Sequence, residues 1–130
     1  MAKEKILLPS SILIEFDHLF LKIKNICPEE PPTLIHGDLW KGNFLITKNH
    51  CPVLIDPSIA YSHREMDLAM TQLFGGFDPS FYDAYQNAYP LEPNFEERVE
   101  IYQLYYLLVH LNLFGTTYLP SIQNILKKFA

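Results

Sequence analysis

Cysteine is scarce in this sequence: only Cys27 and Cys51 occur, far apart and without a CxxC partner. A zinc site built on cysteine pairs is therefore not expected. The start, MAKEKILLPSSILIEF, has no long apolar core and no small-residue cleavage site, so we do not expect a signal peptide. We accordingly expect a cytoplasmic protein, in which two reduced, idle thiols are favoured over a disulfide.

Positive charge is also in short supply. The sequence has 10 Lys and Arg against 15 Asp and Glu, which gives a net charge of −5 without a basic tail. This balance argues against nucleic acid or an anionic membrane as the main partner, although it is compatible with a local basic patch. Long apolar runs are missing as well, since no segment approaches the ~20 residues of a membrane span.

What remains is the composition of a globular protein. The 130 residues are 48% apolar and 19% charged, which suits one folded domain with its own core. No internal repeat, low-complexity tract or linker divides the chain. We therefore predict a single domain over residues 1–130.

The first half of the chain is predicted to be a helix followed by short strands. Apolar residues recur at helical spacing from Ile12 to Ile26, behind a cap at Ser10 or Ser11. The run CPEEPPT ends this helix because prolines cannot continue it. Short apolar segments that suit strands follow at Thr33–Ile35, Phe44–Thr47 and Val53–Asp56. A hairpin joins the last two, and the polar stretch Ser58–Glu65 is predicted to be irregular.

The second half is predicted to be helical. The four expected helices cover about Glu65–Phe74, Pro79–Asn87, Phe95–Phe114 and Leu119–Phe129. Gly75-Gly76 stops the first, Asp78 caps the second, and Asn94 with Glu97 fits a capping box for the third. The fold class is therefore mainly α with a small β hairpin (α+β), and the polar loops lie around that hairpin.

Three polar side chains stand out around the hairpin. Asp38 and Asn43 share one loop in LIHGDLWKGNFLIT, and Asp56 ends the returning strand. A hairpin would set Asn43 beside Asp56, so the three side chains could converge on a cation. Hard oxygen ligands suit Mg²⁺, which takes its remaining ligands from water and phosphate. The order of parts matches the kinase template for phosphoryl transfer: a catalytic Asp, an Asn five residues on, then a metal-binding Asp.

The wider motifs resemble one family of small-molecule kinases. IHGDLWKGN, followed by VLIDPSIAYSHREMDLAM, is similar to phosphotransferases of the aminoglycoside and choline kinase type, which carry HGD where protein kinases carry HRD. Within that group, HGDLWxGN, DP, YxHREMDLAM and LFGGF resemble the fructosamine kinase (ketosamine kinase) family. The segment FYDAYQNAYPLEPNFEERVEIYQLYYLLVHLNLFGTTY is similar to that family's C-terminal helices, so the resemblance covers roughly residues 10–128.

This resemblance implies the C-terminal lobe of a protein-kinase-like fold. Its catalytic loop would lie at residues 34–47, its metal-binding loop at 53–67 and its helical part at 65–130. Asp38 would be the catalytic base, and Asn43 and Asp56 the metal ligands. Asp67 would hydrogen-bond back to the catalytic loop, and His36 would brace that loop from behind.

Two further residues follow the HGD motif. Trp40 is expected to shape the sugar pocket. Lys41 departs from the resemblance, because a small residue is expected there. Two roles stay open for Lys41: it adds a positive charge near phosphate, or its side chain points to solvent.

Several other polar residues have competing interpretations. His63 and Arg64 could contact phosphate or substrate, but an ion pair of Arg64 with Glu65 or Asp67 is at least as well supported. His110 lies in LLVHLNLF, which favours a core or groove histidine over a ligand.

The resemblance also implies an N-terminal lobe, which we expect to be absent. The sequence has no glycine-rich phosphate loop, strand lysine or partnering helix glutamate at positions where that lobe would carry them. The family uses ATP and Mg²⁺ to phosphorylate a sugar hydroxyl of ketosamines, which helps to release the glycated amine. We expect weak or no ATP turnover by this chain alone.

Three hypotheses about function stay open. The chain is part of a kinase whose upper lobe is separate, a non-catalytic remnant that acts as a binding module, or a kinase of the aminoglycoside or choline type. The expected ligand is a ketosamine or glycated amine. Exposed apolar surface on the strands and first helix would favour a homodimer or a separate N-lobe partner.

Overall fold

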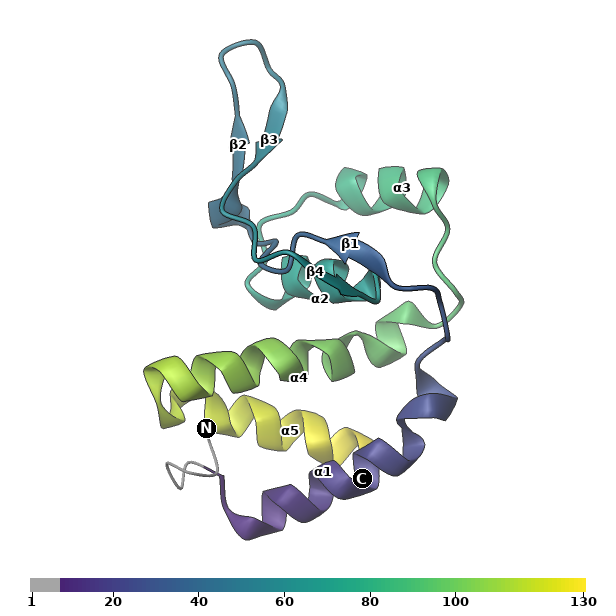
Figure 1. The fold of residues 1–130 in the computed structure, drawn as a ribbon, viewed down its shortest axis with the longest axis vertical. Coiled ribbons are helices and arrows are strands. Elements are labelled where there is room, and N and C mark those ends of the chain that lie inside the picture. Colours follow the sequence, from purple (N-terminus) through teal and green to yellow (C-terminus); the bar gives the residue numbers. More distant parts are fainter. Residues whose placement is uncertain (1–7) are drawn as a thin grey trace. The chain divides into compact units, whose positions relative to one another are not determined.

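The computed structural model describes residues 8–130, and the chain forms two compact units. One contains residues up to Glu29 together with Glu100–Ala130, and the other contains Glu30–Val99. Helices predominate and the strands are short and antiparallel (Figure 1), so the predicted α+β class is confirmed. The prediction of one domain over 1–130 stays a prediction, and its residues 1–7 lie outside the described part.

The first unit is helical. It contains α1 (Ser10–Ile26), most of α4 (Phe95–Phe114), the short 3-10 helix η2 (Thr116–Tyr118) and α5 (Leu119–Phe129). α1 and α5 lie against each other (Figure 1). Their buried apolar residues, with those of α4, are Ile12, Phe16, Leu19, Ile101, Leu104, Leu107, Leu111, Ile122, Ile125 and Leu126. These side chains follow helical spacing, which explains why the sequence predicted the helices.

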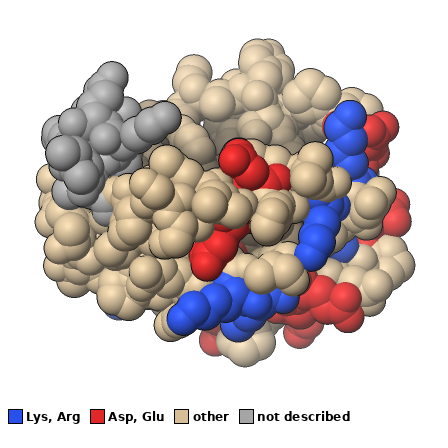
Figure 2. Space-filling model, turned by 90° about the horizontal axis from the view of Figure 1, so that it is seen from below, with Lys and Arg blue, Asp and Glu red and all other residues tan. Residues whose placement is uncertain are grey.

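The surface of this unit carries charges of both signs. Lys128 Nζ contacts both carboxylate oxygens of Glu100, at 2.6 and 2.7 Å, and Lys22 Nζ donates to the backbone oxygen of Phe129. On the face shown in Figure 2, basic and acidic side chains lie next to one another. That face is therefore not a field of a single sign.

Two predicted helix caps are wrong. α1 begins at Ser10, and the residue before it, Pro9, is the N-cap and makes no side-chain bond. Neither Ser10 nor Ser11 therefore caps this helix. Asn94 has φ +66°, whereas a capping residue has extended backbone, so it does not form the predicted capping box for α4. Each motif had the right residue types, but its backbone takes another conformation.

The second unit holds the strands. β2 (Phe44–Ile46) and β3 (Pro52–Leu54) form the predicted hairpin, with Leu45 opposite Val53. β1 (Thr33–Ile35) pairs with β4 (Ala60–Ser62), with Leu34 opposite Tyr61. β4 falls in the stretch predicted to be irregular, so that prediction is wrong. The pairing brings the chain back to the start of the loop that was predicted to be catalytic.

Two helices complete this unit. α2 (Glu65–Leu73) ends before Gly75-Gly76, as predicted. α3 (Pro79–Ala88) begins with the predicted cap, in which the Asp78 carboxylate accepts the Ser80 N–H at 2.9 Å. This hydrogen bond lowers the pKa of Asp78 below its usual range. Both helix boundaries were therefore readable from local sequence.

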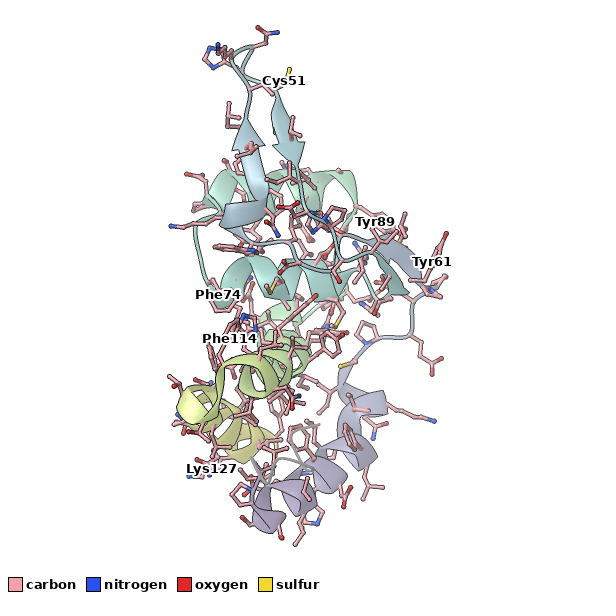
Figure 3. The ribbon with its side chains drawn as sticks, turned by 60° about the vertical axis from the view of Figure 1, so that its left-hand side comes forward. Cys51, Tyr61, Phe74, Tyr89, Phe114 and Lys127 are labelled. Carbon is pink, nitrogen blue, oxygen red and sulfur yellow. The ribbon has the colours of Figure 1, made fainter. Side chains whose placement is uncertain are left out.

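The expectations about a membrane span and about a disulfide can be compared with this structure. In the part of the chain that is described, no helix is long and apolar enough to cross a membrane. Cys27 and Cys51 are not joined by a disulfide within residues 8–130, and Cys51 lies at the hairpin tip (Figure 3).

Candidate active site

The turn after β1 is held by a carboxylate from α2. Asp67 accepts hydrogen bonds from the backbone N–H groups of His36 (2.7 Å) and Gly37 (2.9 Å). Gly37 has φ +80°, and a Cβ there would lie 1.8 Å from the backbone oxygen of Ser58. No side chain fits at position 37, so the turn can lie directly against the returning chain. Two bonds to an ionised acceptor then fix its two amides.

The His36 ring lies between the turn and the end of the hairpin. Its Nε2 contacts the backbone oxygen of Ile55 at 2.9 Å, and its Nδ1 contacts the backbone N–H of Asp38 at 3.3 Å. A carbonyl oxygen can only accept, so Nε2 carries the proton and Nδ1 is the acceptor. The neutral ring therefore links Asp38 to the residue before Asp56.

Asp38 and Asn43 are in direct contact. The Asn43 side chain is buried, and its Nδ2 donates to the backbone oxygen of Asp38 (2.9 Å) and to the carboxylate Oδ2 (3.0 Å). Because both partners are acceptors, the NH₂ end of the amide must face Asp38. The amide oxygen Oδ1 of Asn43 then faces the other way, and this bond leaves the carboxylate Oδ1 of Asp38 unused.

Asp56 follows the residue that pairs with Asn43. The Ile55 N–H donates to the backbone oxygen of Asn43 at 3.0 Å, so the hairpin ladder continues beyond β3. Asp56 is exposed and has φ +49°, a left-handed conformation that is uncommon outside glycine. Such backbone often occurs at functional sites. The amide oxygen of Asn43 and the carboxylate of Asp56 are hard donors, which fits the predicted magnesium ligands.

Two side chains of the predicted catalytic loop, Trp40 and Lys41, pack against glycines. A Cβ on Gly42 would fall 2.2 Å from the Trp40 ring, and one on Gly76 would fall 2.4 Å from Cδ of Lys41. Phe74 meets Trp40 edge to face, with ring centroids 6.5 Å apart and planes at 73°. The stem of Lys41 therefore lies on the Gly75-Gly76 turn. That turn both ends α2 and makes room for the loop.

Comparison with known proteins identifies the family. The family model described as "Fructosamine kinase" matches residues 11–130. The chain belongs to the fructosamine kinase family. The resemblance drawn from HGDLWxGN and the later motifs is thereby confirmed.

The relatives of this fructosamine kinase family member are longer proteins. A "Probable ketoamine kinase" of Lactiplantibacillus plantarum is 59% identical over 98 residues, which are 75% of this chain and 35% of that protein. The "Ketosamine-3-kinase" of Mus musculus is 38% identical over 128 residues, which are 98% of this chain and 40% of that protein. The chain thus spans well under half the length of these curated relatives.

A solved structure supports the predicted fold. A crystal structure from Thermobifida fusca, named a "putative fructosamine-3-kinase", matches 98% of this chain with a TM-score of 0.90 and 34% sequence identity. The match covers 45% of that chain. The described residues therefore have the fold of part of a fructosamine kinase.

Arg64 makes a different ion pair from the one predicted. Its guanidinium contacts both carboxylate oxygens of Glu30, at 2.7 and 3.0 Å, and not Glu65 or Asp67. It also donates to the backbone oxygens of Tyr89 and Pro90. The hydrogen bond with Glu30 raises the pKa of Arg64 and lowers that of Glu30. Arg64 therefore links Glu30 to the chain at residues 89–90.

The neighbouring Glu65 makes a second buried pair. Its carboxylate contacts the Arg98 guanidinium at 2.8 Å (Nε) and 2.5 Å (Nη2), and the two residues are 0% and 3% exposed. Arg98 also donates to the backbone oxygens of Glu92 and Pro93. Residues 64, 65 and 67 of one motif thus fix three different segments of this family member.

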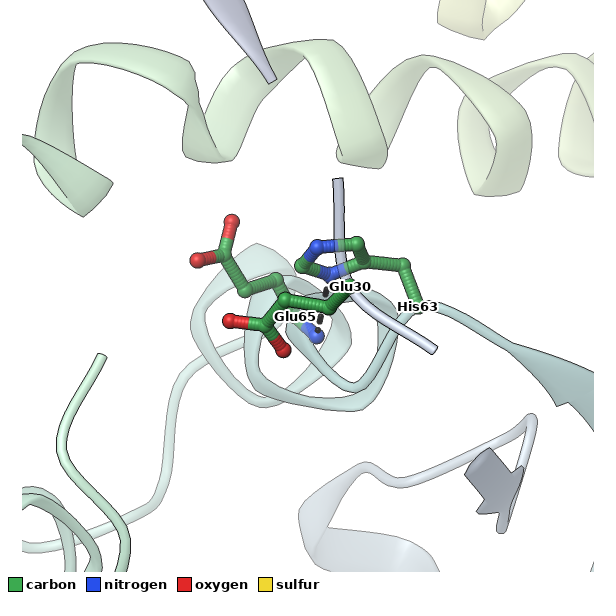
Figure 4. Close-up of side chains that lie close together, drawn as sticks. All are labelled: Glu30, His63 and Glu65. Carbon is green, nitrogen blue, oxygen red and sulfur yellow. Dashed lines mark hydrogen bonds between the residues drawn. The ribbon is translucent and has the colours of Figure 1, made fainter. Parts of the chain in front are cut away.

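A cluster of possible ligand atoms occurs nearby, but its carboxylates are in use. Potential ligand atoms of Glu30, His63 and Glu65 lie within 4.8 Å of one another (Figure 4). His63 Nδ1 accepts the backbone N–H of Glu65 at 3.2 Å. Because each carboxylate already binds both nitrogens of an arginine fork, the cluster is explained by ion pairing rather than metal binding.

Sequence reasoning missed the partners that lie far along the chain. Glu30 and Arg98 were not considered, and Phe74 entered only as part of the predicted helix from Glu65 and of the motif LFGGF. The contacting pairs Arg64–Glu30 and Arg98–Glu65 are 34 and 33 positions apart. The only signal for them was an arginine beside an acidic residue in HREMD, and it suggested the local pair instead.

Proposed function

We propose that residues 33–67 form the hydroxyl-activating and metal-binding half of a ketosamine kinase. In this role the site transfers the γ-phosphate of ATP to a sugar hydroxyl of a ketosamine and so promotes loss of the glycated amine. The observation that carries the proposal is the direct bond between Asn43 and the Asp38 carboxylate. Membership of the fructosamine kinase family and the names of the relatives support the same activity.

Asp38 acts on the attacking hydroxyl. Its Oδ1 accepts the hydroxyl proton while the hydroxyl oxygen forms a bond to the γ-phosphorus and the bond from that phosphorus to ADP breaks. The Asn43 amide holds Oδ2, so the carboxylate can present only one oxygen to the substrate. Asp67 and His36 position the loop and take no part in the proton transfer.

Asn43 and Asp56 would hold the magnesium ion. A bound ion neutralises charge on the phosphates. Asn43 Oδ1 and the Asp56 carboxylate are the donors of this chain for it. The protein would supply only a few of the ligands, which agrees with a cation that keeps several waters and phosphate oxygens.

The activity is proposed for these residues together with the remainder that the longer relatives carry. A chimera tests this directly: the matched segment of the Lactiplantibacillus plantarum relative is replaced by the corresponding residues of this chain. We expect the chimera to phosphorylate a fructosyl amine with ATP and Mg²⁺, and Asp38→Asn to lower its kcat by about 100-fold or more. A folded chimera that is inactive, although the parent is active, contradicts the proposal.

The isolated 130 residues provide the second test. We expect weak or no turnover, and magnesium-dependent ATP binding that is measurable by calorimetry and is lost in Asp56→Ala. The matched control is Asp17→Ala, since Asp17 is exposed on α1, away from the catalytic loop in sequence. Equal binding by both variants would assign the cation to other residues. Binding without turnover in the chimera would favour a non-catalytic binding module.

We also propose that the hairpin binds a partner surface. Leu45, Ile46 and Leu54 are each at least half exposed, and a two-stranded hairpin is marginal without packing. A homodimer or a separate polypeptide that supplies the rest of the kinase would cover these residues. Sedimentation at several concentrations tests the homodimer, with Ile46→Lys expected to weaken it and Leu113→Lys as the control, since Leu113 is exposed on α4, outside the strands and the first helix. A concentration-independent monomer excludes the homodimer.

A further inference from the structure

We propose that Trp40 and Phe74 form an aromatic subsite that binds the protonated amine of a ketosamine. The inference rests on the proposed function, because it concerns the same substrate. It goes further by assigning the charged part of that substrate to two named rings. Phe74 contacts Trp40 and positions it.

The backbone places the indole and the catalytic carboxylate on one tight turn. The backbone N–H of Trp40 donates to the backbone oxygen of Asp38 at 3.2 Å. Both side chains therefore start from the same turn, two positions apart. The sugar hydroxyl at Asp38 and the amine of a ketosamine are separated by only a few bonds, so one molecule can engage both.

Two neighbours restrict how the indole can lie. The ring packs on Gly42, where an added Cβ would come within 2.2 Å of it. Phe74 packs against it at 73°, with a centroid separation of 6.5 Å. Such edge-to-face pairs are the favoured geometry of aromatic contacts. Trp40 and Phe74 are nevertheless 37% and 41% exposed as whole residues, so the pair is held in place but not fully covered.

The chemistry of the pair favours a cation. The face of an indole carries the negative part of its quadrupole and attracts ammonium groups more strongly than other aromatic side chains do. A ketosamine carries a secondary amine that is protonated at neutral pH, next to the sugar. The Asp38 carboxylate adds a negative charge on the same turn. Lys41 is the adjacent cation in the sequence, but its stem packs on Gly76.

Trp40 is the one tryptophan among the 130 residues, so tryptophan fluorescence, excited selectively over the eight tyrosines, reports on this position alone. The experiment titrates the purified chain, without nucleotide, with fructosyl-lysine and separately with fructose, which lacks the amine. We expect saturable quenching by fructosyl-lysine and binding of fructose that is roughly fivefold weaker or more. N-acetyltryptophanamide measures collisional quenching by each ligand.

Variants identify the ring that positions the indole. Phe74→Leu keeps an apolar side chain but removes the ring, and we expect it to shrink the difference between the two ligands to less than about twofold. Tyr61→Leu is the matched control, since Tyr61 is an exposed aromatic residue of the same unit that lies well away from Phe74 in Figure 3. That variant should bind both ligands as the parent chain does.

Each outcome decides the proposal. Equal affinity for the two ligands, absence of saturable quenching, or an unchanged ligand difference in Phe74→Leu overturns it. The result is independent of catalysis because no ATP is present. Selective quenching with an inactive chimera would sink the proposed kinase activity and keep the subsite, whereas an active chimera without selective quenching would do the reverse.

Discussion

The two units of the chain are stabilised by different forces. In the first, the least exposed large side chains are apolar: Ile12, Leu111, Ile122 and Leu126 are all at most 1% exposed. In the second, the buried set includes Arg64, Glu65 and Arg98, and a carboxylate holds the catalytic turn. The difference teaches that the second unit adds directional bonds to its apolar packing, while the helical unit depends mainly on volume and apolar area.

Removing one side of the buried ion pair should give the largest effect. Arg98→Ala leaves the Glu65 carboxylate buried without its partner and should lower the free energy of unfolding by about 3–5 kcal/mol. Urea denaturation measures the loss. The exposed pair Lys128–Glu100 is the control, since Lys128→Ala should cost less than about 1 kcal/mol. Similar losses in both variants would remove the contrast between buried and surface pairs.

A cavity in the helical unit should come next. Leu111 is 0% exposed, and Leu111→Ala should destabilise the protein by about 3 kcal/mol through lost contacts and an unfilled space. Hydrogen exchange should show the lost protection mainly in α1 and α5. Leu111→Met, which nearly conserves volume, should cost less than about 1.5 kcal/mol. If protection falls first in β1 and α2, the two units are not separately stabilised.

Removing the carboxylate of Asp67, which holds the turn after β1, should have a smaller effect on stability. Asp67→Asn replaces an acceptor that serves two amides by a group with one acceptor oxygen, which should cost about 1–3 kcal/mol. Faster hydrogen exchange at the amides of His36 and Gly37 is the specific signature. Unchanged exchange there would show that the turn is held by other contacts. Asp83→Asn, on the exposed face of α3, is the control.

The mildest test uses pH. The bond to Arg64 lowers the pKa of Glu30 in the folded state. A depressed acid stabilises above the unfolded-state pKa, near 4.3, and this contribution is lost as pH falls through the folded-state value. Stability should therefore drop below about pH 4.3, and Glu30→Gln should flatten that part of the profile. An acid limb as steep in Glu30→Gln as in the parent chain would contradict this assignment.

Much of the fold could be predicted because its signals are local. Prolines and glycines mark the helix ends, and apolar runs mark β1, β2 and β3. β4 was missed because Ala60, Tyr61 and Ser62 show no buried alternation, and their strand geometry comes from pairing with β1. A backbone ladder to a distant partner leaves no pattern in the segment itself.

The candidate site divides in the same way. Asp38 and Asn43 are five positions apart, so their spacing within one loop could be interpreted from the sequence. Glu30, Arg98 and Phe74 lie more than 30 positions from the residues they contact, Arg64, Glu65 and Trp40, and only the topology brings them together. Where an acidic neighbour was available, local reasoning chose it. The roles of Asp38, Asn43 and Asp56 in catalysis stay predictions.

Asp67 belongs to the nine-residue helix α2, whose Leu68, Ala69 and Met70 are buried. The support of the catalytic turn is thus carried by a short piece of packing. A screen of random variants that scores phosphorylation alone will count packing defects in α2 as losses of chemistry. Measuring protein abundance in the same cells separates packing defects from losses of chemistry. Variants at positions 68–70 should then be mostly packing defects with lowered abundance.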